Sequence, residues 1–305
     1  MPSPYSLPQI YDIAFDFRDV PGECDFLLKV AGDQLGRPVR SAIELACGPA
    51  YHVREFARRN LISHGLDNSP EMVTYANELI TREKLDAKIF LGDMRNWQSD
   101  QKYDLAYILI ASFAHLLTNR DILDHLNCVA DMLTDDGLYI ISTAHPRDVW
   151  HEAHSATTDS GNVPSGVLKG RPDLADDISW TQSRDGFTVT TNWGSTNQHF
   201  DPLTEIDDVV ISFDVEQNGQ TTRHEFPTQL RRLSFQTFMA LVQLSGRFAV
   251  VDMYGDFDLD TKLSNDPASV RFVPVLKKLS EQILLPLGEG ALREGRMRGV
   301  QLSRL

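Results

Sequence analysis

The sequence predicts an α/β fold: a doubly wound, mostly parallel sheet of seven strands with an antiparallel β insertion after the fifth strand. Strand and helix patterns alternate from residue 41 to residue 145, which is typical of a parallel sheet with helices on both faces. The run 103–110 is nearly all apolar, as a strand covered on both faces should be. Later runs alternate without helices between them, and the pair Asn218-Gly219 predicts a hairpin turn. We expect this insertion to pack over the central sheet.

The individual elements follow from apolar spacing and from cap residues. Apolar residues at helical spacing predict the helices, with Ser69 and Ser234 as N-cap residues. The triplet Asp135-Asp136-Gly137 predicts a turn before the fifth strand. The expected strands are 41–46, 61–66, 87–91, 103–110, 138–142, 187–193, 209–215, 221–230, 248–253 and 269–276, and the expected helices are 24–36, 53–59, 69–84, 121–133 and 234–244.

Composition and charge exclude several classes of protein. The 305 residues are 42% hydrophobic and 24% charged, which suits an ordinary globular protein with a sizeable core. Residues 1–10 lack both parts of a secretory signal, and no apolar run is long enough to span a membrane. Three scattered cysteines fit neither a disulfide framework nor a metal site, so we expect a cytoplasmic protein without a metal. The net charge of −14 disfavours nucleic acid as a partner.

Residues 42–50 contain the first indication of a ligand. They form a buried strand pattern followed by a turn of small residues, and a helix pattern comes next. Asp67 ends the following strand, roughly 20 positions after the turn, and this layout places a nucleoside at the carboxyl ends of parallel strands. Ala46 and Ala50 stand where a dinucleotide-binding turn has glycines. They therefore disfavour a cofactor with a pyrophosphate, and with it a nicotinamide dehydrogenase.

Four short motifs follow one another at the expected strand ends. They are residues 44–50, 65–72, 92–94 and 103–106, and the Asp135-Asp136-Gly137 turn comes after them. In this order they resemble the motifs of class I S-adenosylmethionine (SAM)-dependent methyltransferases, strongly over 41–145 and in outline over 234–276. The segment 112–116 and the pair Tyr11-Asp12 are similar to small-molecule N-methyltransferases, such as glycine N-methyltransferase and the amino-sugar N,N-dimethyltransferases.

The resemblance implies a Rossmann-like methyltransferase fold and a division of the chain. Residues 1–40 would form an N-terminal helical lid segment, and residues 41–150 and 231–276 the SAM-binding core. Residues 151–230 would form an antiparallel substrate lid, and residues 277–305 a C-terminal tail.

The same resemblance assigns one group of residues to the ribose and methionine parts of SAM. The carboxylate of Asp67 would accept both ribose hydroxyl groups. Ala46 and Gly48 would let the backbone approach the methionine portion, because glycine in particular leaves this space free. Glu44 would either brace the turn or reach the ammonium group of the cofactor through water, and a purely structural carboxylate stays open.

A second group would surround the adenine. Asp93 would accept from the adenine amino group, and the backbone amide of Met94 would donate to a ring nitrogen. Asn68 and Met72 would flank the adenine or ribose, although Met72 also fits a plain core role on its helix. Ile110 would line the site through its backbone carbonyl.

Tyr11 and His115 are the candidates for the reacting end. Tyr11 would close over the methionine end of the cofactor, or else pack the N-terminal helix on the core. The imidazole of His115 could take a proton from an attacking ammonium or hydroxyl group near neutral pH, or it could hold its loop in place. Trp150, Trp180 and Trp193 could offer aromatic faces to a substrate, or pack the insertion.

The sequence therefore predicts a SAM-dependent methyltransferase that transfers a methyl group to a small-molecule acceptor by in-line displacement. An amine nitrogen is the favoured acceptor atom. Two alternatives stay open, an O-methyltransferase acting on a hydroxylated metabolite and a non-catalytic SAM-binding regulatory protein. We expect a monomer or a homodimer.

Overall fold

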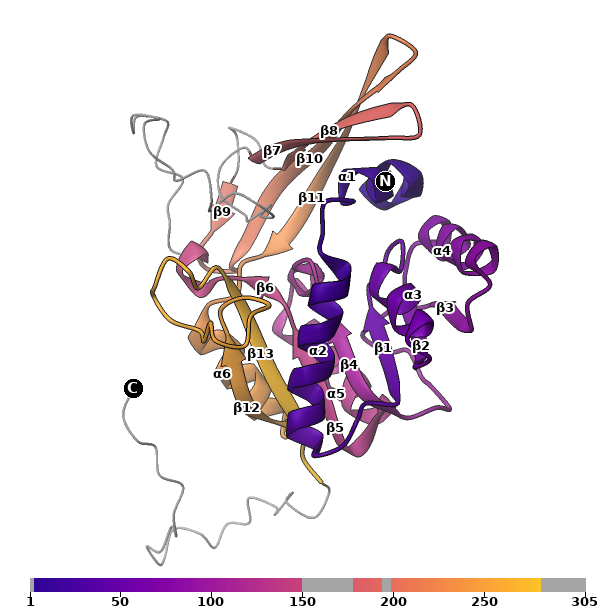
Figure 1. Cartoon of the computed structure of the whole chain (residues 1–305). Helices are drawn as coiled ribbons and strands as arrows, with labels where there is room; N and C mark the ends of the chain where they lie inside the picture. Colours follow the sequence, from indigo (N-terminus) through magenta and orange to yellow (C-terminus); the bar gives the residue numbers. More distant parts are fainter. Residues whose placement is uncertain (1–2, 150–177, 194–198, 281–305) are drawn as a thin grey trace, which may run out of the picture.

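The computed structural model describes residues 3–149, 178–193 and 199–280. Over these residues the chain forms a large central sheet flanked by helices, with a second sheet beyond one end of its strands (Figure 1). Trp150, the predicted loop at 151–175 and most of the predicted tail lie outside the described residues.

Seven main strands form the central sheet in the order β12-β13-β5-β4-β1-β2-β3, and the short strand β6 adds to β13. The first five strands along the chain pair in parallel, and β13 is antiparallel to both of its main neighbours. This confirms the predicted doubly wound, mostly parallel sheet. The strands are β1 (Ser41–Leu45), β2 (Ile62–Asp67), β3 (Ala87–Leu91), β4 (Tyr103–Ile108), β5 (Leu133–Ile141), β6 (Thr143–Ala144), β12 (Phe248–Tyr254) and β13 (Arg271–Lys278).

Strands β1 and β4 lie at the centre of the sheet, where the strand order reverses. Every residue of both strands is buried, which explains their continuous apolar character. The chain leaves β1 towards β2 on one side and later returns to β4 on the other. Such a reversal opens a crevice at the carboxyl ends of the strands, where α/β folds bind ligands.

Helices cover both faces of the sheet. Apolar residues of α2 and α3 pack on one face of β1 and β4, and those of α5 and α6 pack on the other. The predicted caps are confirmed, because Ser69 and Ser234 accept backbone N–H groups at the starts of α4 and α6. The helical segments are η1 (Pro4–Ser6), α1 (Pro8–Ala14), α2 (Val20–Leu35), α3 (Tyr51–Arg58), α4 (Pro70–Glu83), η2 (Ser112–His115), α5 (Asn119–Met132), η3 (Pro146–Val149) and α6 (Phe235–Ser245).

The second sheet is antiparallel, as predicted, with the order β11-β10-β8-β7 and β9 paired with β10. At the hairpin tip, Asn218 and Gly219 have φ angles of 53° and 76°, so both residues are left-handed as a tight hairpin turn requires. Its strands are β7 (Ile178–Arg184), β8 (Phe187–Trp193), β9 (His199–Asp201), β10 (Ile206–Gln217) and β11 (Gln220–Arg231).

The position of this second sheet corrects a prediction. The sequence predicts an insertion that packs over the central sheet. Its buried residues, such as Val189 and Phe213, instead pack with Tyr11, Ile13 and Phe15 of the N-terminal segment. Figure 1 shows α1 between the insertion and the helices of the core. The insertion therefore covers the N-terminal segment, which has too few residues to form a core of its own.

The triplet Asp135-Asp136-Gly137 corrects a second prediction. It forms a bulge within β5 rather than a turn before it, because the pairing with β4 skips from Leu133 to Leu138. A Cβ atom at Gly137 would lie 2.9 Å from the Cβ of Leu133, which is too close for a side chain. These residues thus interrupt the hydrogen-bonded pairing of β5 with β4, and the same strand resumes the pairing at Leu138.

Candidate functional site

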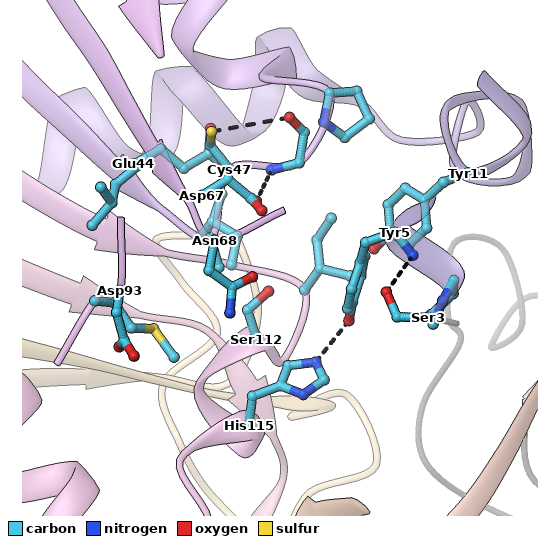
Figure 2. Close-up of a pocket in the computed structure, with 18 of the residues that line it drawn as sticks. Ser3, Tyr5, Tyr11, Glu44, Cys47, Asp67, Asn68, Asp93, Ser112 and His115 are labelled. Atoms are coloured by element: carbon cyan, nitrogen blue, oxygen red, sulfur yellow. Dashed lines mark hydrogen bonds between the residues drawn. The ribbon is translucent and has the colours of Figure 1, made fainter. Parts of the chain in front are cut away.

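A cavity of about 440 Å³ lies at the carboxyl ends of β1, β2 and β4. Residues of the central sheet and its loops line one side, and the N-terminal segment lines the other. Figure 2 shows Asp67 and Asn68 between Asp93 on one side and Tyr5 and Tyr11 on the other. We call this space the site cavity.

The turn after β1 forms one wall of the site cavity. Ala46, Gly48 and Ala50 are all left-handed, with φ angles of 52°, 51° and 61°. Glycine adopts this region freely, whereas each alanine costs about 1–2 kcal/mol there. The backbone N–H of Gly48 donates to Oδ2 of Asp67 at 2.8 Å, which ties the turn to the end of β2. Ala46 and Gly48 both line the cavity, as predicted for residues near a ligand backbone contact.

Asp67 is buried at the centre of this wall, with 8% of its surface exposed. Its Oδ1 accepts the backbone N–H of Ser69 at 2.9 Å, and its Oδ2 accepts that of Gly48. Burial raises the pKa of the Asp67 carboxyl above its usual value, although these two N–H groups favour the ionised form. A carboxylate oxygen can accept more than one hydrogen bond, so Asp67 retains capacity for ligand hydroxyl groups.

Asn68, Asp93 and Met94 line the part of the cavity beyond Asp67. Arg95 binds Asp93 at 2.6 Å, and this pair lowers the pKa of Asp93 below its ordinary value. The carbonyl oxygen of Met94 accepts from Nδ1 of His125 at 2.9 Å, which fixes the backbone of the loop. The loop after β3 therefore presents an ionised carboxylate and a held backbone to the cavity.

Met72 occupies the core position that the sequence left open beside the ligand role. Its side chain is fully buried in an apolar cluster with Tyr11, Ala14 and the insertion, and it is not among the residues that line the cavity. Met72 lies on the apolar face of α4, and the first turn of that face packs against the N-terminal segment. Ile110, by contrast, lines the cavity with a left-handed φ of 53°.

Four charged side chains form a buried cluster at the end of the cavity near the turn. Arg18 pairs with Glu23 through two of its nitrogens, and Nε2 of His52 lies 2.7 Å from Oε2 of Glu23. Nδ1 of His52 lies 3.3 Å from Oε1 of Glu44. Among the described residues, Nη1 of Arg18 and Oε2 of Glu44 are buried and have no hydrogen-bond partner. We call these four residues the charged cluster.

The charged cluster joins three parts of the fold. Glu44 belongs to β1, His52 to α3 and Glu23 to α2, while Arg18 lies between α1 and α2. Burial raises the pKa of Glu23, but Arg18 and His52 outweigh burial and lower it to about 2. Arg18, Glu44 and His52 line the cavity. The cluster therefore holds the ion pair of Arg18 and Glu23 next to the cavity wall. Two polar atoms of the same cluster, Nη1 of Arg18 and Oε2 of Glu44, lack a partner among the described residues.

Tyr5, Tyr11 and His115 form the opposite end of the cavity. The hydroxyl of Tyr5 lies 2.7 Å from Nε2 of His115 (Figure 2). Burial lowers the pKa of His115 to about 4, so its imidazole is neutral at pH 7. Tyr11 stacks on Phe15 with ring centroids 4.4 Å apart and also contacts the ring of Tyr5. Tyr11 thus lines the cavity and packs the N-terminal helix at the same time, so both predicted roles are compatible with its position.

Two of the predicted substrate-facing tryptophans lie elsewhere. Trp180 and Trp193 pack on the ring of Phe15, and Nε1 of Trp180 donates to the carbonyl of Ala14 at 2.7 Å. Neither residue is among those that line the cavity. They attach the insertion to the N-terminal segment, which was the alternative left open from the sequence.

Sequence reasoning missed three polar residues of the site, Tyr5, Arg18 and Glu23. All three precede the first strand and belong to no recognisable motif, so only the folded chain brings them to the strand ends. A charged pair at the start of a helix was the available signal, but helix starts commonly carry such residues on the surface.

A family model described as a methyltransferase domain matches residues 42–137. The match ends within the bulge of β5. It includes Glu44, Asp67 and Asp93, but it does not include the N-terminal segment that carries Tyr5.

One curated relative matches a third of the chain. A dTDP-3-amino-3,4,6-trideoxy-alpha-D-glucopyranose N,N-dimethyltransferase of Streptomyces venezuelae is 25% identical over 101 residues, which are 33% of this chain. The match spans only 41% of the length of that relative.

Solved structures share the architecture of the described chain. A SAM-dependent methyltransferase from Clostridium acetobutylicum has a TM-score of 0.67 at 16% identity, covering 89% of this chain and 97% of the other. A SAM-bound amino pentose methyltransferase from Micromonospora echinaspora has a TM-score of 0.61 at 15% identity, covering 88% and 97%. At such low identity these likenesses show the fold, which is the Rossmann-like methyltransferase fold predicted from the sequence.

Among residues 3–149, 178–193 and 199–280, no helix has the length and apolar character needed to span a membrane.

Proposed function

We propose that this protein is a SAM-dependent methyltransferase that acts on a small molecule, with an amine nitrogen as the acceptor. The observation that carries the proposal is the pair of unpartnered atoms at one end of the site cavity. Nη1 of Arg18 is a buried donor and Oε2 of Glu44 a buried acceptor. Burying both without partners is costly, so a ligand with a carboxylate and an ammonium group would satisfy them together. The methionine end of SAM carries this pair of groups.

The rest of the cavity fits the remaining parts of SAM. Asp67, next to the turn, is a buried carboxylate that can accept two hydroxyl groups, as a ribose requires. Asp93 lies across the cavity from Tyr5 and is held in its ionised form by Arg95, which suits an amino group such as that of adenine. When bound, SAM supplies a methyl group already activated by the sulfonium charge. The protein therefore has to orient the acceptor and exclude water.

Tyr5 and His115 are the groups we assign to the acceptor. The acidic side chains of the cavity lie at Glu44, Asp67 and Asp93, whereas the Tyr5–His115 pair carries no charge at pH 7. An uncharged polar pair can hold an amine in its nucleophilic, neutral form without stabilising the ammonium form. The curated relative is named as an N,N-dimethyltransferase of an amino sugar, which also supports an amine.

The first prediction tests the cofactor assignment through Asp67. Wild-type protein should bind SAM or S-adenosylhomocysteine in the micromolar range, and Asp67→Ala should abolish this binding because two ribose hydroxyl groups lose their acceptor. Titration calorimetry with S-adenosylhomocysteine measures both.

The matched control is Asp86→Ala, which removes an exposed carboxylate that does not line the cavity. It should bind as the wild type does. Unchanged binding by Asp67→Ala would show that the ribose assignment is wrong. A different result would favour the dehydrogenase alternative over the proposal. In that case wild-type protein would not bind S-adenosylhomocysteine, and titration with NADH would change the fluorescence.

Turnover then separates the remaining alternatives. A screen of small amines and phenols, read as formation of S-adenosylhomocysteine, distinguishes an N-methyltransferase from an O-methyltransferase. Binding of SAM without turnover on any acceptor would favour the regulatory alternative. The cytoplasmic location, the monomeric or dimeric state and the absence of a nucleic-acid partner stay predictions.

A further inference from the structure

His52 is the central residue of the charged cluster, and its two ring nitrogens face two different carboxylates. Nε2 lies 2.7 Å from Glu23, and Nδ1 lies 3.3 Å from Glu44. Glu23 is ionised at neutral pH, since its pKa is about 2, and an ionised carboxylate only accepts hydrogen bonds. Nε2 must therefore carry a proton.

The second nitrogen then decides the charge of the ring. If His52 were neutral, the lone pair of Nδ1 would face the oxygen of Glu44, which is repulsive. A protonated ring donates towards both carboxylates instead. His52 is only 1% exposed, so water cannot replace either contact. The geometry thus favours an imidazolium held between α2 and β1.

Both neighbours of His52 lead to an unpartnered atom. Glu44 uses Oε1 towards His52 and leaves Oε2 without a partner. Glu23 accepts from Nε of Arg18 at 3.2 Å and from Nη2, which leaves Nη1 of Arg18 without a partner. Removing His52 would therefore release the side chains that carry both unpartnered atoms.

We propose that His52, as an imidazolium, is a positioning residue that fixes Glu44 and, through Glu23, Arg18 for the two charged groups of the amino-acid end of the cofactor. This inference rests on the proposed function. His52 acts through its neighbours and does not carry out chemistry. The cluster is electrically balanced, with Arg18 and His52 opposite Glu23 and Glu44, so it suits a ligand end that is itself a zwitterion.

The charges around His52 give the direction of its pH dependence. Glu44 on β1, Glu23 on α2 and Arg18 before α2 face it, and Tyr107 of β4 packs edge-on at 6.2 Å. Burial lowers the pKa of His52, but Glu44 and the bond to Glu23 outweigh burial and raise it above its ordinary value, against the smaller opposing effect of Arg18. The imidazolium is therefore favoured below this raised pKa and is lost as the pH rises through it.

The test uses two nucleosides that differ only in the amino-acid end. S-Adenosylhomocysteine has this end, and 5′-methylthioadenosine lacks it. We expect His52→Gln to weaken S-adenosylhomocysteine binding at least about tenfold, the value of one or two charge-assisted hydrogen bonds. Binding of methylthioadenosine should stay within about twofold, because Asp67 and Asp93 are unaltered. Calorimetry on the full chain measures both affinities.

The pH profile provides a readout that simple destabilisation would not move. Wild-type affinity for S-adenosylhomocysteine should fall as His52 loses its proton, and this component should be absent in His52→Gln. Deprotonation of the ligand ammonium affects both proteins equally, so the difference between the two profiles isolates His52. The matched control is His64→Gln, which replaces a histidine that bonds Tyr103 and does not line the cavity.

The outcomes are distinct. Equal weakening of both nucleosides, or an unchanged pH profile, would overturn the role of His52 and leave the proposed function standing. Failure of the wild type to bind either nucleoside would overturn the proposed function itself. If His52→Gln does not fold, as judged by thermal unfolding, Glu23→Gln breaks the same link from the other side and should show the same selective loss.

Discussion

Tyr5 and His115 show how single residues determine the acceptor end of the site. The hydroxyl of Tyr5 and Nε2 of His115 are 2.7 Å apart. Within the described residues, these two atoms form no other hydrogen bond. Burial lowers the pKa of His115 to about 4 and raises that of Tyr5 well above its usual value. Both groups are therefore neutral from about pH 5 to pH 9, and their hydrogen bond fixes the orientation of the imidazole.

The second prediction, after that for Asp67, concerns this hydrogen bond. Tyr5→Phe should lower kcat roughly tenfold, because one neutral hydrogen bond is worth up to about 1.5 kcal/mol. The affinity for S-adenosylhomocysteine should change little if the pair serves the acceptor. Steady-state kinetics and calorimetry measure the two effects separately.

A double variant makes the coupling explicit. Tyr5→Phe combined with His115→Gln should cost little more than His115→Gln alone, because the two groups act as one unit. Additive losses would contradict the pairing, and a loss confined to nucleoside binding would place Tyr5 on the cofactor side instead.

Several of the residues predicted from the sequence lie at or just after the end of a strand. Asp67 ends β2, Asp93 lies two residues after β3, and the cavity wall includes both. Strand ends meet at one edge of a parallel sheet, so chain order alone brings these residues together. Tyr5 and Arg18 lie before the first strand, and their positions depend on packing across the molecule. No local pattern could have placed them in the site.

At the scale of elements, local signals failed where a longer-range contact decided the outcome. The residues at 135–137 have the composition of a turn, yet they bulge out while β5 continues along β4. Met72 lies on the apolar face of α4, and its own neighbours are residues of the N-terminal segment rather than a ligand. The caps of α4 and α6 were predicted correctly because an N-cap depends only on residues within one helical turn.

The link between the insertion and the N-terminal helix is the element contact on which the site depends most directly. Arg184 at the end of β7 pairs with Asp12 and Asp16 of the N-terminal segment. Asp12 is 4% exposed, and Tyr75 of α4 also donates to its Oδ2 at 2.7 Å. A single buried carboxylate thus joins the insertion, α1 and the core. Tyr11, its neighbour in sequence, is held over the cavity by the same contacts.

A third prediction follows for Arg184→Met. Breaking this partly exposed ion pair leaves the carboxylate of Asp12 buried without its cation. The free energy of unfolding should fall by about 2 kcal/mol, which is less than for a fully buried ion pair. For a chain of this size that cost corresponds to a fall of about 3 °C in the unfolding midpoint. Nucleoside binding should weaken as well, because Tyr11 is less firmly held. Calorimetric scanning and titration measure the two.

Arg223→Met is the matched control in the same sheet. Arg223 pairs with Asp214 and Glu225, but its side chain is 51% exposed, so the substitution should cost less than about 1 kcal/mol. Equal effects of the two variants would mean that the link through Asp12 contributes nothing specific to the site.

At the scale of the whole molecule, the sheet separates two roles. One face packs α2 and α3, which bring Glu23 and His52 to Glu44 on the same side of β1. The other face packs α5 and α6, and His125 of α5 supports the loop at Met94. The cavity wall is thus braced from opposite faces of the sheet, at Glu44 by His52 and at Met94 by His125, and these two buried histidines have opposite shifts of pKa.

The opposite shifts predict that acid destabilises the molecule through His125. Its Nδ1 donates to the carbonyl of Met94, so Nε2 accepts from the hydroxyl of Tyr139 at 2.6 Å and has no room for a proton. Burial lowers its pKa to about 4, whereas an unfolded histidine titrates near 6.5. The unfolded chain therefore binds the extra proton first. The stability that this neutral histidine maintains is complete above pH 6.5 and is lost as the pH falls towards 4, by about 3 kcal/mol.

Denaturant unfolding at several pH values between 7 and 4 tests this prediction when the wild type is compared with His125→Gln. The variant should be less stable at pH 7, because two buried hydrogen bonds are altered, but its stability should fall less steeply with acid. His115 has a similarly low pKa and contributes to the slope of both proteins, as do the carboxylates, so the difference between the two slopes belongs to His125. Parallel slopes would contradict the assignment, because a histidine that is already protonated in the folded protein takes up no further proton on unfolding.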